Sequence, residues 1–155
     1  MPVIKSTTLA VAMLAVAAVL APHQQPALAD EAAATGASLY ERLGSWEGIQ
    51  QIVSDTIANH RKNPAISHYF ADTDTAVLAG HVTAFFAAGT GGPAKYEGRD
   101  MTTTHAAMGL SDADFDTAVA DVLLALDMNG IGDAEKTEVA AILESLRPAV
   151  MGSGG

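Results

Sequence analysis

Apolar residues recur at helical spacing along most of this 155-residue chain, and no segment of strand length alternates apolar with polar residues. Helical spacing places apolar side chains on one face of a helix, whereas alternation would place them on one face of a strand. The sets are Ile49, Ile52, Val53 and Ile57; Phe115, Val119, Val122, Leu123 and Leu126; and Val139, Ile142, Leu143, Leu146 and Val150. The pattern predicts an all-α fold.

Capping and breaking residues set the limits of the expected helices. Ser45, Ser111 and Asp133 are predicted N-caps, because their side-chain oxygens can accept hydrogen bonds from the free backbone N–H groups of a first turn. The expected helical segments are residues 38–43, 45–62, a short helix through 66, a helix from 73 or 74 to about 89, and then 102–108, 111–129 and 133–150. Gly91-Gly92-Pro93 forces a turn, and residues 90–100 are predicted to form one long loop.

Composition excludes several classes of function. No cysteine is present, so disulfides, thiolate metal sites, iron–sulfur clusters and cysteine nucleophiles are excluded. Eight Lys and Arg against 18 Asp and Glu give a net charge of −10, which leaves no basic patch for nucleic acid. The chemistry must therefore come from histidines, carboxylates or a bound cofactor.

The N-terminal segment has the pattern of a signal peptide. Lys5 precedes an unbroken apolar run, Leu9–Ala21, which Pro22 ends, and Ala27-Leu28-Ala29 has the small-x-small form of a cleavage site. The run is too short for a membrane span of about 20 residues. We expect residues 1–29 to be removed, with export to the periplasm and no stable membrane insertion. An uncut anchor or a buried helix is the alternative. Residues 30–37 are then a loose leader, 38–150 the folded domain and 151–155 a tail.

Two histidines lie on apolar helix faces. His81 shares a stripe with Leu78, Val82 and Phe85, and His105 is flanked by Met101 and Met108. Each imidazole by itself fits a hydrogen-bonded core residue. Two buried imidazoles facing one cavity would be costly without partners, and a metal between them would satisfy both. Imidazole is a common ligand of haem iron, and the predicted walls suit an apolar macrocycle. Those walls are Ile57, Phe70, Leu78, Val82, Phe85 and Met101.

The sequence resembles a group 1 truncated haemoglobin over about residues 38–150. The matching motifs are Leu39-Tyr40-Glu41-Arg42-Leu43-Gly44, Tyr69-Phe70, Phe85-Phe86, Gly91-Gly92-Pro93, Tyr96-x-Gly98-x-x-Met101-x-x-x-His105 and Leu110-Ser111-x-x-x-Phe115. The resemblance implies a two-over-two helical sandwich around haem b in a monomer. It makes His105 the proximal iron ligand, Phe70 the aromatic residue packed on the haem, and Tyr96 and Met101 further pocket residues.

The departures from the family pattern concern the distal side of the haem. Ile57 replaces a tyrosine that hydrogen-bonds oxygen in many members, and Leu78 and Val82 replace polar residues. His81 matches a distal histidine that coordinates iron in a subset of members, including cyanobacterial ones. Some of those proteins also link haem covalently to a histidine of the last helix. No histidine follows His105, so a non-covalent haem is expected.

The other charged residues are interpreted more simply. Lys95 and Arg99 either pair with haem propionates or are solvated. His60 is expected to be exposed at a helix end, where cations favour the dipole, and His68 to face outward. The acidic residues Asp112, Asp114, Asp116 and Asp121 are interpreted as a solvated face, and Asp133 and Glu135 as charges of a first turn.

Several functions are compatible with this sequence. One is binding of the diatomic gases O₂, CO or NO, with NO dioxygenase-like or peroxidase-like activity as an extension. Others are electron transfer with a redox partner and periplasmic haem carriage or storage. A five-coordinate oxygen-binding globin with His81 turned to a propionate, and a helical module without haem, are the remaining alternatives.

Overall fold

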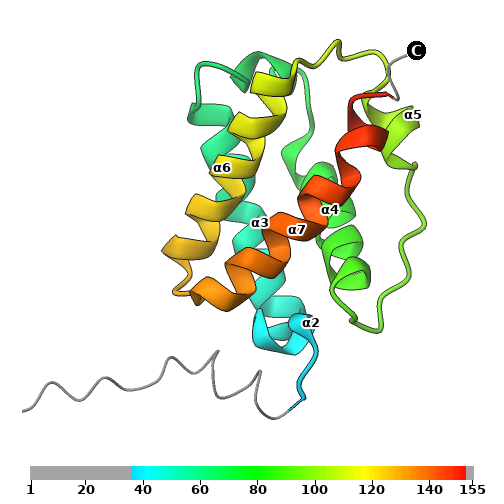
Figure 1. Cartoon of the computed structure of the whole chain (residues 1–155). Coiled ribbons are helices and arrows are strands. Elements are labelled where there is room, and N and C mark those ends of the chain that lie inside the picture. Colours follow the sequence, from blue (N-terminus) through cyan, green and yellow to red (C-terminus); the bar gives the residue numbers. More distant parts are fainter. Residues whose placement is uncertain (1–35, 153–155) are drawn as a thin grey trace, which may run out of the picture.

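The computed structural model describes residues 36–152, which are helical except for turns and one long loop (Figure 1). The predicted signal peptide and most of the predicted leader lie outside the described residues. The elements in chain order are α2 (Leu39–Arg42), α3 (Ser45–Lys62), the 3₁₀ helix η1 (Ser67–Phe70), α4 (Thr75–Gly89), α5 (Met101–His105), α6 (Asp112–Met128) and α7 (Asp133–Val150).

Four longer helices form two packed pairs. Helix α3 packs most extensively against α4 and α6, and α6 packs against α7. The short helix α5 lies against the C-terminal part of α7, and the long loop that leads to it runs along the outside of the molecule (Figure 1). The two pairs thus enclose the interior, and the α4–α5 loop borders it.

The apolar stripes predicted from the sequence form the core. Ile49, Ile52, Val53 and Ile57 of α3 are all buried, as are Val122 and Leu126 of α6 and Val139 of α7. Burial of each such side chain contributes about 1.5–3 kcal/mol. The all-α prediction is confirmed within residues 36–152.

Two predicted N-caps are wrong by one residue. Ser111 is confirmed, since its hydroxyl accepts from the backbone N–H of Asp114 while the Asp114 carboxylate accepts from the Ser111 backbone. Helix α3 instead begins after Gly44, which takes a left-handed conformation with φ 87°, and α7 begins after Gly132. In both places a glycine occupies the N-cap position, so the residue with a capping side chain is already inside the helix.

A buried ion pair joins α2 to α7. The Arg42 guanidinium donates to Glu135 Oε1 at 2.6 Å and to Glu138 Oε2 at 2.8 Å. The Glu135 side chain is fully buried and that of Arg42 only 7% exposed, whereas that of Glu138 is 47% exposed. Glu135 lies in the first turn of α7, as the sequence predicts, and the structure adds that its carboxylate is buried and paired with Arg42.

No helix within residues 36–152 is long and apolar enough to cross a membrane.

Candidate functional site

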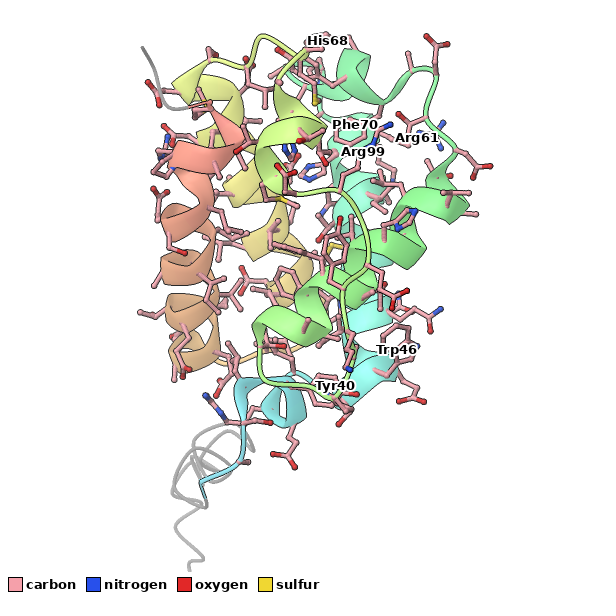
Figure 2. The ribbon with its side chains drawn as sticks, turned by 90° about the vertical axis from the view of Figure 1, so that its right-hand side faces the viewer. Tyr40, Trp46, Arg61, His68, Phe70 and Arg99 are labelled. Atoms are coloured by element: carbon pink, nitrogen blue, oxygen red, sulfur yellow. The ribbon has the colours of Figure 1, made fainter. Side chains whose placement is uncertain are left out.

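A cavity of about 780 Å³ lies between the helix pairs and the α4–α5 loop. This volume is within the range of about 300–1,000 Å³ that is typical of cofactor sites. Side chains from α3, η1, α4, α5, α6 and α7 line it, and most of them are apolar. Phe70 and Arg99, which both line the cavity, lie toward the same end of the molecule, away from Tyr40 and Trp46 (Figure 2).

Helix α5 presents His105 to this cavity in a fixed orientation. Asp100 caps α5, accepting from the backbone N–H of Thr103 at 2.8 Å, and this bond lowers the pKa of the Asp100 carboxyl. His105 Nδ1 lies 2.8 Å from the carbonyl oxygen of Met101, one turn earlier. A carbonyl can only accept, so Nδ1 carries the proton and the neutral ring keeps its lone pair on Nε2. A lone pair on Nε2 is what a metal ligand requires.

The second predicted ligand, His81, lines the same cavity from helix α4. Asp74 caps this helix by accepting from the backbone N–H groups of Ala76 and Val77, which anchors its first turn. Leu78 and Val82, which flank His81 on its stripe, also line the cavity. His81 is exposed, so its imidazole reaches both the cavity and the solvent.

The loop before α5 is held against the cavity by aromatic contacts. The Tyr96 ring meets Phe85 edge to face, with centroids 5.1 Å apart. The Tyr96 hydroxyl donates to the Arg99 carbonyl at 2.8 Å, which closes a tight turn just before α5. Tyr96, Phe85, Arg99 and Met101 all line the cavity, as the sequence predicted for pocket residues.

Two of the predicted pocket residues lie elsewhere. Ile57 is buried in the core and does not line the cavity, and Lys95 is exposed on the loop away from the lining. Helix α3 instead turns Ile52, Thr56 and His60 to the cavity. Residues four apart share a helix face, whereas Ile57 is rotated by about 100° from Thr56.

The expectation that His60 is solvent-exposed is wrong. Its side chain is only 12% exposed, and Nδ1 lies 3.0 Å from Asp121 Oδ2 on α6. The ring also stacks on Phe70, with centroids 5.2 Å apart. Asp121, predicted to lie on a solvated face, is buried, and Asn63 donates to both of its carboxylate oxygens. No local pattern signals this cluster, because Asp121 lies about 60 residues from His60 and Asn63 in the chain.

A second carboxylate of α6, that of Asp114, also does not lie on the solvated face that the sequence predicts. Asp114 lines the cavity and accepts from the Tyr69 hydroxyl at 3.2 Å. Hydrogen bonds from Ser111 lower the pKa of Asp114, while desolvation and the bond to Asp114 raise the pKa of Tyr69. His68, the neighbour of Tyr69, is exposed as predicted.

The residues around the cavity fit a large apolar ligand that carries a metal. Two imidazoles line it, and the Nε2 lone pair of His105 is available. Within the described part of the chain, no group of three or more His, Cys, Asp or Glu could hold a metal ion by itself. The donor set therefore suits a metal whose remaining ligands come with a macrocycle, as in haem.

Comparison with known proteins decides the family. The sequence model of the bacterial-like globins matches residues 38–151. A group 1 truncated haemoglobin of Synechocystis sp. is 33% identical over 109 residues, covering 68% of this chain and 88% of that protein. This chain belongs to the group 1 truncated haemoglobins. It is therefore a haem-binding globin, and the resemblance seen in its motifs is confirmed at the level of the family.

Solved structures confirm the two-over-two fold of this truncated haemoglobin. The Fe(III) form from Tetrahymena pyriformis superposes with a TM-score of 0.72 at 28% identity, covering 74% of this chain and 98% of that one. The 2/2 haemoglobin of Synechococcus sp., in the cyanomet state with covalently attached haem, gives a TM-score of 0.70 at 26% identity, with coverage of 74% and 98%.

Proposed function

We propose that this truncated haemoglobin holds haem b without a covalent link, with His105 as the proximal ligand and His81 as an internal sixth ligand. The observation that carries the proposal is the pair of imidazoles lining one apolar cavity. The absence of any histidine after His105 supports a non-covalent haem, because the last helix offers no imidazole for a covalent link.

The support for His105 is its hydrogen bond to Met101. The hydrogen bond to the Met101 carbonyl fixes the ring plane and the tautomer of His105. The ring therefore needs no reorientation before Nε2 can bind a metal. Asp100 in turn holds the short helix that carries this histidine.

The support for His81 is its position between two apolar neighbours that cannot bind iron. Leu78 and Val82 line the cavity with His81, and His81 is the basic side chain of α4 that lines it. Because His81 is also exposed, the alternative is that it turns outward and leaves a five-coordinate site. The sequence predicts the apolar Ile57 on this wall of the cavity. In the structure Thr56 and His60 line it instead, and both bring polar groups to the cavity.

Haem in this cavity would supply an iron that binds diatomic gases and exchanges single electrons. The protein orients His105, excludes water with apolar walls and sets how often His81 vacates the cavity. Any external ligand has to compete with His81, so its apparent affinity falls by the fraction of time that the site is open. An open fraction of about 1% would lower the affinity about 100-fold.

Spectra of purified protein with haem test this arrangement. The wild-type ferrous form should be six-coordinate and low-spin, and His81→Leu should make it five-coordinate and accelerate CO binding. His105→Leu should weaken haem retention. His68→Leu, which removes an exposed imidazole outside the cavity, is the matched control and should change neither. A wild-type ferrous spectrum that is already five-coordinate, with CO binding unaffected by His81→Leu, would establish the alternative in which His81 faces outward.

Export belongs to the same proposal. Lys5, the apolar run Leu9–Ala21 and the Ala27–Ala29 site support cleavage after Ala29 and a periplasmic location. Gas binding, electron exchange with a redox partner, or haem storage would then take place outside the cytoplasm.

A further inference from the structure

We propose that His60, backed by Asp121, is a proton acceptor for small weak acids of the form HX, such as hydrogen sulfide and hydrogen cyanide, that enter the haem cavity as ligands. The inference rests on the proposed haem site and adds the class of ligand that this cavity accepts. It assigns a role to two residues that neither the motifs nor the predicted ligand pair includes.

The first step concerns the state of the Asp121 carboxylate. It is buried on α6 and accepts from Asn63 Nδ2 at 3.0 and 3.2 Å, so it has donors suited to an ionised carboxylate. A buried carboxylate without such donors would be costly to ionise. Asn63, in the turn after α3, thus supplies hydrogen bonds to both oxygens of this carboxylate.

The second step concerns the tautomer of His60. Because the ionised carboxylate of Asp121 can only accept, the proton of the neutral His60 ring lies on Nδ1, 3.0 Å from Asp121 Oδ2. The lone pair is then on Nε2. No hydrogen bond to this nitrogen comes from any residue between 36 and 152, and the side chain lines the cavity. The base is therefore free to meet a ligand.

The third step is positional stability. The His60 ring is clamped between the Asp121 carboxylate and the Phe70 ring, whose plane is inclined to it by 20°. Its side chain is 12% exposed, so bulk water has limited access to it. A base held in this way needs no rearrangement before it accepts a proton.

The proton transfer is simple to balance. The H–X bond breaks and its electron pair stays with X, which remains in the cavity as the anion X⁻. The proton bonds to the lone pair of His60 Nε2, giving an imidazolium whose charge the Asp121 carboxylate stabilises. No oxidant or reductant is required. A neutral diatomic such as CO has no proton to lose, so His60 does not assist its binding in this way.

The other charged groups of the cavity are placed differently. His81, His105, Glu97, Arg99 and Asp114 also line it. Among them His81 is a second imidazole that could accept the proton of HX in place of His60. The test is therefore made in the His81→Leu background. His105 has its Nδ1 bonded to the Met101 carbonyl and is assigned to the iron.

The experiment compares two ligands in haem-loaded His81→Leu protein. Cyanide binding to the ferric form is measured at neutral pH, where the free ligand is HCN, and CO binding to the ferrous form is measured in parallel. Adding His60→Gln should slow cyanide binding by about 100-fold, at the low end of general-base effects, while CO binding changes less than about twofold. Asp121→Asn should slow cyanide binding in the same direction. His68→Gln, an exposed imidazole outside the cavity, should leave both rates unchanged.

A second measurement does not depend on ligand rates or on variants that fold. Nitrogen-15 NMR of the wild-type CO complex should show His60 protonated on Nδ1 and unprotonated on Nε2. Equal slowing of cyanide and CO by His60→Gln, no slowing of cyanide, or a His60 ring protonated only on Nε2 would overturn the inference. Failure of the haem site itself would be distinct, because the protein would then show no Soret band with added haem.

Discussion

The buried ion pair between α2 and α7 allows a sharp test of how this domain is stabilised. One guanidinium, that of Arg42, faces two carboxylates of the same helix. Glu135 is fully buried at 2.6 Å, and Glu138 is 47% exposed at 2.8 Å. The two acids thus differ in burial while sharing a partner, so each is the control for the other.

Glu135→Gln should lower the free energy of unfolding by about 3 kcal/mol. Removing one partner of a buried pair costs about 3–5 kcal/mol, because the other charge is left uncompensated. Glu138 still neutralises part of the Arg42 charge, which favours the lower end of that range. The same loss should lower Tm by about 10 °C for a domain of this size.

Glu138→Gln should cost less than about 1 kcal/mol, as is usual for a partly exposed pair. The double replacement Arg42→Met with Glu135→Leu should recover most of the loss, because apolar side chains of similar volume tolerate this environment. Urea unfolding of the three variants, with and without haem, measures these differences. Equal costs for Glu135→Gln and Glu138→Gln would refute the argument from burial.

Three further predictions concern the cavity and the N-terminus. In the His81→Leu background, Leu78→Gln adds one hydrogen-bond donor to the cavity, worth about 1 kcal/mol, so O₂ release measured by stopped flow should slow roughly fivefold. An unchanged release rate would contradict the placement of residue 78 beside the bound gas. Asp100→Ala should speed haem loss to a haem-scavenging apoglobin at neutral pH, whereas Asp133→Ala, on an exposed first turn, should not. The folded-state pKa of Asp100 lies below its usual 3.8, so the stability that this cap gives to α5 is fully present above pH 3.8 and is lost as the pH falls through the lowered pKa. The haem-loss rates of Asp100→Ala and wild-type protein should therefore converge at that low pH. N-terminal sequencing of protein from the native host should begin at Asp30, and an intact Met1 would refute export.

Local features of the fold could be predicted because short-range chemistry determines them. Ser111 caps α6 through a residue only three positions away, and His105 bonds a carbonyl four positions back, as helical geometry predicts. The N-caps of α3 and α7 lie one residue before the predicted Ser45 and Asp133, because glycines occupy both positions and a glycine carries no side-chain signal for a cap.

The long-range pairs could not be predicted from the sequence. His60 and Asp121 are 61 positions apart, and Arg42 and Glu135 are 93 apart, so only the packing of α3 on α6 and of α2 on α7 brings them together. Charged residues are exposed in most proteins, which is why the sequence predicts an exposed His60 and a solvated Asp121. The position of Ile57 in the family pattern predicts that it lines the cavity, but the orientation of α3 turns Thr56 to the cavity instead.

The link between Arg42 and Glu135 also has a consequence for the order of folding. Among the described helices α2 is made first and α7 last, so the contact closes a loop of 93 residues, which is slow to form. During synthesis the Arg42 guanidinium emerges long before Glu135 and Glu138, its two carboxylate partners within residues 36–152, have been made. Helix α2 therefore docks late. Such a delay leaves α2 without its contact to the last described helix while α3 to α6 are being made.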